Sequence, residues 1–298
     1  MLRTLSDALR PQALLEFELP LAPQRIEELP APQPGGEALR IHAPVGRLLL
    51  LLSVDGPLTL AFEATLFDML ANARFPVSKP RRTRGGSLLA QLKGPSGPAA
   101  ATCYSLPAGE SLRVEDASTP QLLDVGRLLA RLHQLGEAHP ASVGDPLEGG
   151  HLAARLPSGE TGEALREVLQ PGVQGLPVGA VHGGLTPAHA LFVGTRVSAI
   201  LPSGTSCSAP LVIDLAQALC AWALPLEHPL PALRALVSGY QALRRLAAEE
   251  RDALHPALRF AAARVGALKL LSGQPDQALS ALHACDALAS ADVRAAAG

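Results

Sequence analysis

The sequence is poor in aromatic residues, in charged residues and in cysteine. Its 298 residues include six Phe, two Tyr, one Trp and four Cys, 17% of the residues are charged, and the formal net charge is −2. Surfaces that bind nucleic acid usually combine a basic patch with interleaved aromatic residues, and no such stretch is present. We therefore expect neither a nucleic-acid partner nor an anionic membrane surface as a partner.

The cysteine spacing and the short apolar runs argue against a zinc-binding protein and against a membrane or secreted protein. No C-x-x-C pair connects the cysteines, which argues against a zinc site and predicts free thiols at Cys103, Cys207, Cys220 and Cys285. The five-leucine run 48–52 is far shorter than the roughly 20 residues of a membrane span, and the N-terminal stretch reaches a proline too soon for a signal peptide. We expect a cytoplasmic protein without a membrane partner.

What the chain does have is apolar residues, at 48% of its length, which is ample material for a buried core. Apolar periodicity predicts a helix over 4–15, strands over 25–29, 38–42 and 46–53, a helix over 58–73, and strands near 81–84, 87–92 and 99–104. Further helices are predicted from Thr119 onward and over 162–169, 231–246, 248–271 and 275–288. The first third of the chain is therefore rich in predicted strands, and the rest is predicted to be mainly helical.

The stretch 180–215 carries the most distinctive pattern. Val181 to Gly184 predicts a glycine-paired turn, and residues 190–193 and 197–201 predict two short strands of a hairpin. After a break at 202–204 and a polar loop, Asp214 stands at the start of an apolar helical run, where a carboxylate suits a helix N-terminus. No Asp or Glu occurs between Val168 and Ile213.

These residues resemble the catalytic core of the kinase-like small-molecule phosphotransferases, which include aminoglycoside phosphotransferases, choline kinases and the protein-kinase-fold homoserine kinases. The family pattern runs H-G-D-L-x-P-x-N-V-L-F, then a hairpin, V-I-D-F and D-L-A. The matching positions are His182, Gly183, Leu185, Pro187, Leu191 and Phe192, and then Asp214, Leu215 and Ala216. The stretches 237–243 and 257–264 are most similar to homoserine kinase, so the resemblance spans nearly the whole chain.

The positions that carry chemistry in this family differ here. By the resemblance, Gly184 stands where the family has a catalytic Asp, His189 where it has a metal-binding Asn, and Pro202 where it has a metal-binding Asp. On the third strand, Leu51 stands where the family has a cation that contacts the nucleotide phosphates. Glu63 lies near the position of that cation's partner, and without the cation we expect a solvated or locally hydrogen-bonded carboxylate.

The residue types at these positions also argue against metal-assisted phosphoryl transfer. Phosphoryl transfer from a nucleotide relies on Mg²⁺ to neutralise the phosphates, and Mg²⁺ takes oxygen ligands, usually including one or two carboxylates. His189 offers nitrogen, and Pro202 offers no side-chain donor or acceptor. We therefore predict that ordinary metal-assisted transfer does not occur at this site, and we expect no metal and no cofactor.

The residues that do match are interpreted as the scaffold of a former site. In the resembled family the His and Asp that correspond to His182 and Asp214 brace the turn at Gly183, and Glu63 is counted with them. The alternatives are that His182 acts as a base, or that His182 and His189 hold a metal, for which a third ligand is missing. The Ser/Thr-rich stretch 203–208 lacks G-x-S-x-G spacing and is interpreted as a polar loop rather than a nucleophile.

A residual ligand cleft is predicted at Tyr104, Ser105 and Leu106. The stretch 104–112 resembles the family's F-L-P-G-x-S-L connection between lobes, whose backbone faces the adenine in active relatives. Backbone contacts need no particular side chain, so weak ATP binding without magnesium stays open.

The resemblance implies an α+β, protein-kinase-like fold with two lobes. We predict a small N-lobe with an antiparallel sheet over 1–106 and a mainly helical C-lobe over 107–298, which carries the degenerate segment 180–215. The leading hypothesis is a pseudokinase, a catalytically inactive relative that is not an enzyme and serves in binding, scaffolding or regulation with an unidentified protein partner. The alternatives are an active phosphotransferase of altered mechanism, acting from ATP on a small alcohol or amine, and a metabolite sensor without turnover.

Overall fold

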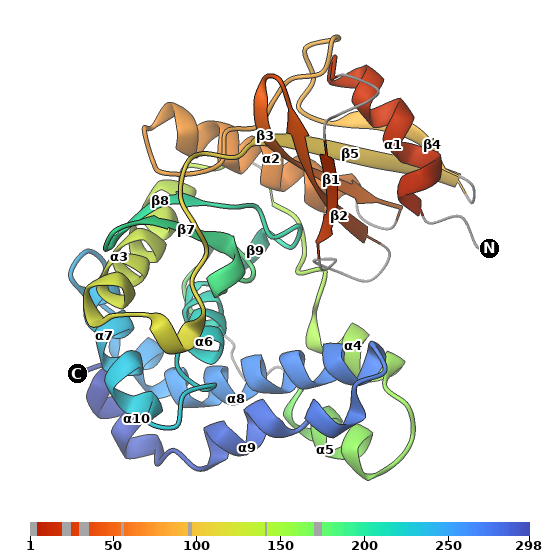
Figure 1. Ribbon diagram of the computed structural model, residues 1–298. Coiled ribbons are helices and arrows are strands. Elements are labelled where there is room, and N and C mark those ends of the chain that lie inside the picture. The colour runs from red at the N-terminus through yellow and green to blue at the C-terminus, as the bar shows by residue number, and fades with distance from the viewer. Residues whose placement is uncertain are drawn as a thin grey trace.

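A computed structural model describes residues 5–19, 25–29, 36–54, 57–94, 97–140, 142–169 and 175–298 of the chain. These residues form an α+β fold of two lobes, with strands gathered in the N-terminal part and helices filling most of the C-terminal part (Figure 1). The predicted fold class is confirmed, while the division of the lobes at residues 106 and 107 stays a prediction. No helix in the described ranges is long and apolar enough to cross a membrane.

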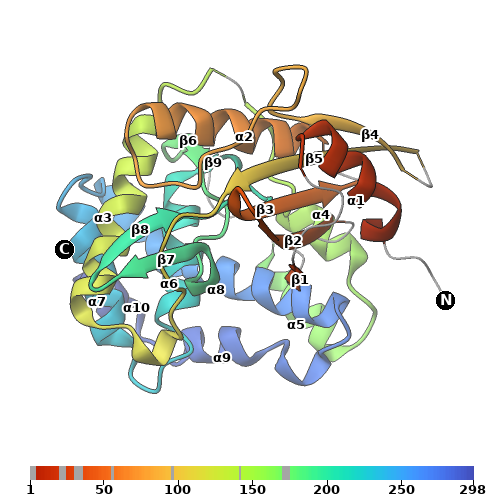
Figure 2. The same ribbon diagram turned by 45° about the horizontal axis from the view of Figure 1, so that its top comes forward.

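The N-terminal lobe is built on a five-stranded antiparallel sheet in the order β1-β2-β3-β5-β4. Its strands are β1 (Arg25–Leu29), β2 (Gly36–Ala43), β3 (Gly46–Ser53), β4 (Ala90–Gly94) and β5 (Gly97–Ser105). Helix α1 (Leu5–Glu16) packs on one face of the sheet and helix α2 (Pro57–Asn72) lies on the other, as the two views show (Figures 1 and 2). The sheet is thus covered on both sides.

The leucine run of β3 is explained by this double coverage. Side chains alternate between the faces of a strand, and a strand buried on both faces needs apolar residues at every position. Leu48, Leu50 and Leu52 pack in the cluster that contains α1, whereas Leu49 and Leu51 pack in the cluster that continues into the C-terminal lobe. The face that carries Leu49 and Leu51 is therefore the one that looks toward the candidate site.

The C-terminal lobe combines helices with two small antiparallel strand pairs. Its helices are α3 (Thr119–Gly136), α4 (Gly149–Arg155), α5 (Glu160–Val168), α6 (Leu211–Trp222), α7 (Pro229–Gln241), α8 (Ala248–Leu271), α9 (Ser280–Asp286) and α10 (Ser290–Ala296). The strand pairs are β6 (Val178–Val181) with β9 (Cys207–Pro210), and β7 (Ala190–Val193) with β8 (Arg196–Ile200). Short 3₁₀ turns occur at Val114–Asp116, Pro187–His189 and Pro275–Gln277.

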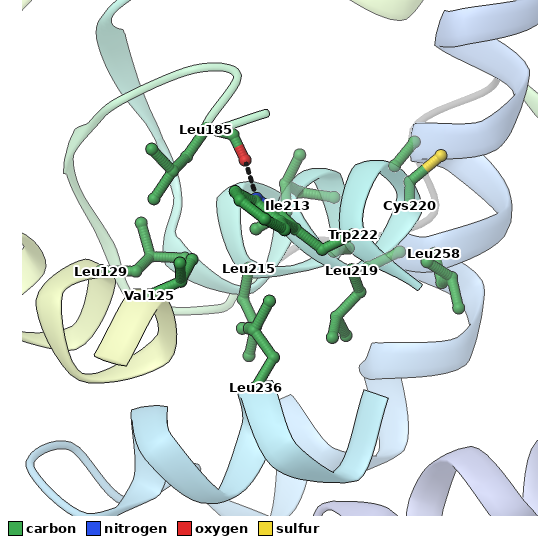
Figure 3. Packing of buried hydrophobic residues seen from close by; sticks show 14 of the residues in the cluster. Val125, Leu129, Leu185, Ile213, Leu215, Leu219, Cys220, Trp222, Leu236 and Leu258 are labelled. Carbon is green, nitrogen blue, oxygen red and sulfur yellow. Dashed lines mark hydrogen bonds between the residues drawn. The ribbon is translucent and has the colours of Figure 1, made fainter. Parts of the chain in front are cut away.

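Helix α6 lies at the centre of this lobe. It is apolar around most of its circumference because α3 and α7 pack on one side and α8 on another (Figure 3). Trp222 is fully buried, and its indole Nε1–H donates a hydrogen bond to the carbonyl of Leu185 at 2.9 Å. A buried tryptophan normally finds such a partner for its N–H group. The contact ties α6 to the loop that follows His182 and so helps to position the site.

Most predicted elements are confirmed, but several differ, and α4, β6 and β9 were not predicted. No strand forms over 81–84, because the Gly86 N–H bonds back to the Thr83 carbonyl at 2.9 Å and closes a turn. The predicted helix over 275–288 is divided into a 3₁₀ turn and α9, and α10 follows it unpredicted. Helix α6 begins at Leu211, so Asp214 lies within its first turn rather than before it.

Candidate active site

The centre of the candidate site is the carboxylate of Asp214, which is fully buried. It accepts the backbone N–H groups of His182 and Gly183, each at 2.9 Å, and lies 3.0 Å from Nε2 of His133. Burial raises the pKa of Asp214, but the contacts with His133 and His182 outweigh it and hold the pKa below its usual value. The carboxylate therefore braces the turn after β6 as an anion.

His133 and Tyr240 extend this bracing through the lobe. Nδ1 of His133, on α3, lies 2.7 Å from the Tyr240 hydroxyl on α7, and both side chains are buried. The chain from Asp214 through His133 to Tyr240 links α6, α3 and α7. Nothing near Tyr240 in sequence indicated that it belongs to this network.

His182 is also fully buried, which favours a structural role over the alternative role as a base. Its Nε2–H donates to the carbonyl of Leu201 at 2.8 Å, while Nδ1 has no partner among the described residues. Burial lowers the pKa of His182 despite the opposing effect of Asp214, so the imidazole is neutral near pH 7.

The two glycines that follow His182 differ in whether the surrounding structure has room for a side chain. Gly183 has a φ of 81°, and a Cβ there would lie 2.3 Å from the carbonyl oxygen of Thr205, so only glycine fits. At Gly184 the nearest atom to an added Cβ would be Oγ1 of Thr205 at 3.7 Å. The position where the family has its catalytic Asp therefore has room for a side chain that this sequence does not supply.

Glu63 enters the site from α2 and is neither solvated nor paired with a cation. Its carboxylate accepts the N–H groups of Ser203 and Gly204, both at 2.9 Å, and the Ser206 hydroxyl at 2.8 Å. Burial raises its pKa to about 6, and these hydrogen bonds act in the opposite direction. The carboxylate is hydrogen-bonded rather than solvated, but its partners lie 140 to 143 residues away in the sequence and are not local. The polar loop after Pro202 serves to hold this group.

Two cavities meet beside the matched segment. The larger, of about 700 Å³, lies between the sheet and the loop 186–189, and its lining includes Leu51, His189 and Pro202. The smaller, of about 160 Å³, lies between that loop and helices α6 and α8. Thr186, His189 and Ala221 line both cavities. The structure thus brings together three of the four positions that differ from the family pattern, with Gly184 lining the smaller cavity.

His189 stands at the junction of the cavities. Its Nδ1 lies 2.9 Å from Oγ1 of Thr186, and its ring centroid lies 5.7 Å from that of His182. Burial and then the nearness of His182 lower its pKa well below the usual 6.5, although the residue keeps some exposure on the cavity side. His189 is therefore a neutral imidazole that lines both cavities.

The residues around the junction do not fit a magnesium ion. The carboxylates of Glu63 and Asp214 are both occupied by backbone N–H groups, and Glu115 lies 3.5 Å from the guanidinium Nε of Arg113. Within the described ranges, no group of three or more His, Cys, Asp or Glu side chains is arranged to hold a metal ion. Since Mg²⁺ takes oxygen ligands in a nearly octahedral arrangement, we derive no step through a metal.

The predicted residual cleft residues lie beside the larger cavity rather than in its lining. Tyr104 is fully buried against Phe67, and the N–H groups of Ser105 and Leu106 bond to the carbonyls of Lys79 and Arg47. The segment 111–115 lines the cavity instead. A role of Tyr104, Ser105 and Leu106 in ligand binding stays a prediction.

Sequence reasoning missed three groups in the cavity lining, namely Arg40, Arg113 and Thr186. Arg40 could have been found from alternation along β2, because it shares a strand face with Ala38. Thr186 lies within the matched pattern at an unspecified position. Arg113 carried no recognisable signal.

Comparison with known proteins gives a consistent result. The model of a family described as "Phosphotransferase enzyme family" matches residues 38–255. Homoserine kinases of Rhodopseudomonas palustris (strain BisB18) and Rhizobium meliloti (strain 1021) are each 30% identical over 223 residues, covering 69% of this chain. The match spans 66% of the length of each of these relatives, slightly less than two thirds. Among solved structures, the amicoumacin kinase hAmiN has a TM-score of 0.74 at 13% identity, covering 94% of this chain and 92% of that one.

These findings overturn the prediction that the protein is not an enzyme. The family that matches most of the chain is one of phosphotransferase enzymes, and the relatives at 30% identity are named as kinases. The prediction rested on Leu51, Gly184, His189 and Pro202. Those residues replace the family's usual functional side chains at four positions, but two cavities that share lining residues lie beside them.

Proposed function

Because the chain belongs to the phosphotransferase enzyme family, we propose that it transfers a phosphoryl group from a nucleoside triphosphate to a hydroxyl or amine of a small molecule. The observation that carries the proposal is the pair of cavities that meet at Thr186 and His189. The larger is of the size that binds nucleotide-sized ligands, and the smaller suits an acceptor of a few heavy atoms. The reacting groups would approach each other at the shared wall.

Positioning is the main catalytic task in this reaction. Phosphoryl transfer passes through a loose transition state, so the protein contributes mostly by alignment and by stabilising charge on the phosphoryl oxygens. In the proposed mechanism the donor lies in the larger cavity with its terminal phosphate toward His189. The acceptor lies in the smaller cavity with its nucleophilic atom toward the same residue.

His189 is proposed to orient the acceptor. Oγ1 of Thr186 lies 2.9 Å from Nδ1 and the Gly184 backbone also bonds to the ring, so the imidazole is held in place, and in the proposal one edge of it faces the acceptor's hydroxyl or amine. Because the low pKa of His189 makes it a weak base, its role is to align the nucleophile rather than to remove the proton early. This arrangement differs from the family pattern, in which an Asp occupies the position of Gly184.

The acceptor class follows from the smaller cavity. Its walls combine apolar groups, including Leu147 and Val265, with the buried guanidinium of Arg264, which pairs with Asp145 at 2.7 Å. A short molecule with both polar and aliphatic parts matches this lining. Homoserine, the substrate in the names of the similar kinases, is of this kind and is the first acceptor to test.

A direct assay of phosphoryl transfer tests the proposed function. The purified chain is incubated with ATP and, in turn, homoserine, a panel of amino alcohols and no acceptor, with Mg²⁺, with Mn²⁺ or with a chelator. Phosphorylated product and ADP are quantified by mass spectrometry and ³¹P NMR. We expect product that depends on the acceptor, and a loss of at least roughly tenfold in rate for His189→Ala, because that change removes the group that aligns the nucleophile.

Exposed Glu137→Gln serves as the control and should retain the full rate. Nucleotide binding without any acceptor-dependent product across the panel would contradict the proposal. So would a His189→Ala variant that keeps the wild-type rate while remaining folded.

A further inference from the structure

The larger cavity lacks a cation at the strand position where the resembled kinases have one. Leu51 is 2% exposed and belongs to the apolar cluster that joins the lobes. The terminal phosphates of a nucleotide carry several negative charges, which need compensation in a partly enclosed cavity. We infer that Arg40, on the neighbouring strand β2, is the phosphate-binding cation of this cavity. The inference rests on the proposed function, since it takes the cavity to be the nucleotide site.

Strand register places Arg40 on the correct face. In the antiparallel pair of β2 and β3, Ala38 is opposite Leu51 and Arg40 is opposite Leu49. Arg40 and Leu51 are therefore diagonal neighbours on one face of the sheet, and such residues lie roughly 7–8 Å apart. A guanidinium at the end of a long side chain easily spans that distance. Arg40, Leu49 and Leu51 all line the cavity.

The guanidinium of Arg40 is incompletely paired within the described part of the chain. Its Nη1 donates to Oε2 of Glu27 at 3.2 Å, whereas its buried Nε has no partner in the described part of the chain. Glu27 also contacts Nε of Arg25 at 3.0 Å, so one carboxylate is shared by two guanidinium groups. The cluster keeps a surplus of positive charge, and a guanidinium fork matches phosphate oxygens in geometry.

The other charged groups of the cavity are less suited. Arg113 also lines it, but its side chain is 80% exposed and its Nε lies 3.5 Å from Glu115. Arg40 is 32% exposed, so its charge is screened less by water than that of Arg113. His189 also lines the cavity but is neutral, because burial lowers its pKa. Among the described lining residues, Arg40 is therefore the cation best placed to hold a polyphosphate.

The experiment compares ligands that differ only in phosphate. Dissociation constants for ATP and for adenosine are measured by calorimetry on the wild-type chain and on Arg40→Ala, Arg40→Lys and Arg25→Ala. Loss of one charge-assisted contact should weaken ATP binding of Arg40→Ala by roughly tenfold or more, while adenosine binding changes little. Arg40→Lys should fall between, because it keeps the charge and loses the fork. Arg25→Ala removes the other guanidinium on Glu27 and should weaken ATP binding less than Arg40→Ala does, because Arg25 does not line the cavity.

A double variant separates phosphate binding by Arg40 from repulsion of ATP by the carboxylate of Glu27. Arg40→Ala leaves Glu27 with one partner fewer, and the carboxylate could then repel ATP. If repulsion were the whole effect, Glu27→Ala/Arg40→Ala would recover wild-type ATP binding, and that result would overturn the role of Arg40. An equal loss of ATP and adenosine, or unchanged ATP binding in Arg40→Ala, would do the same. A wild-type chain that binds neither ligand would instead refute the proposed function, and this inference with it.

Discussion

Glu63 is a buried carboxylate that faces hydrogen-bond donors instead of a cation. Its position on α2 is where the resembled kinases pair a Glu with the cation of β3, and β3 has Leu51 there. The loop after Pro202 supplies N–H and hydroxyl groups that satisfy the oxygens. The polar loop after Pro202 thus takes the place of the cation that β3 lacks as the partner of Glu63.

The raised pKa of Glu63 predicts a pH dependence of stability. In the unfolded chain the carboxyl titrates near 4.5, and in the folded chain its pKa is about 6. Between these values the folded state binds more protons, so this group's contribution falls as pH rises through the window and stays low above it. We expect Glu63→Gln, which does not titrate, to remove this component. The wild-type free energy of unfolding should decline relative to the variant's by about 2 kcal/mol between pH 4 and 7.

Urea denaturation at a series of pH values measures this difference. The exposed Glu137→Gln is the matched control, and its stability should run parallel to wild type over the same range. Parallel curves for Glu63→Gln and wild type would show that the buried carboxyl does not titrate differently in the folded chain.

At the scale of the elements, α3 and α7 touch through glycine. A Cβ added at Gly126 on α3 would lie 2.0 Å from the carbonyl oxygen of Leu236, and one added at Gly239 on α7 would lie 2.1 Å from that of Leu123. The two helix backbones are therefore in direct contact. This close approach also brings Tyr240 within hydrogen-bond distance of His133.

We expect Gly126→Ala to destabilise the protein by roughly 1–3 kcal/mol, because the helices must separate to admit the methyl group. Urea denaturation measures the change. Gly150→Ala is the control, since a Cβ there meets only the side chain of Glu148, at 3.4 Å, and alanine favours a helix. That variant should be as stable as wild type or up to about 1 kcal/mol more stable. If Gly126→Ala left the free energy of unfolding unchanged, the two helices would not be in backbone contact.

At the scale of the whole molecule, one hydrophobic cluster continues from the sheet to the last helix. It includes Leu49 and Leu51 of β3, Trp222 of α6 and Val293 of α10. A second cluster lies on the opposite face of the same sheet and contains Leu50 and α1. Because β3 contributes to both clusters, the two lobes should unfold together.

The single tryptophan reports on this cooperativity. Leu50→Ala removes a fully buried side chain from the cluster that does not contain Trp222, at a cost of about 2–5 kcal/mol. We expect the urea midpoint seen by Trp222 fluorescence to fall together with the midpoint seen by far-UV circular dichroism. Leu58→Ala, at a side chain 73% exposed, should change neither. A fluorescence transition that stays in place while the dichroism transition divides in two would indicate lobes that unfold separately.

The sequence by itself determined the local secondary structure and the types of side chain available to the site. Short runs bounded by turn-forming residues identified β1 and β3 to the residue, and helical periodicity identified α8, because the helical period follows directly from backbone geometry. The resemblance carried by the stretch 180–215 led to the two-lobed fold and to the family. The shortage of carboxylates near that stretch was likewise evident without a structure.

Only the tertiary structure decided which distant groups meet. Glu63 and Ser203 are 140 residues apart, and His133 and Tyr240 are 107 apart, so no local pattern could pair them. The missing ligands in the sequence led to the hypothesis of a pseudokinase that is not an enzyme, and the match to the phosphotransferase family and to relatives named as kinases overturned it. The two cavities and the place of Arg40 in the larger one depend on how sheet, loop and helices pack, which is a property of the whole chain rather than of any segment.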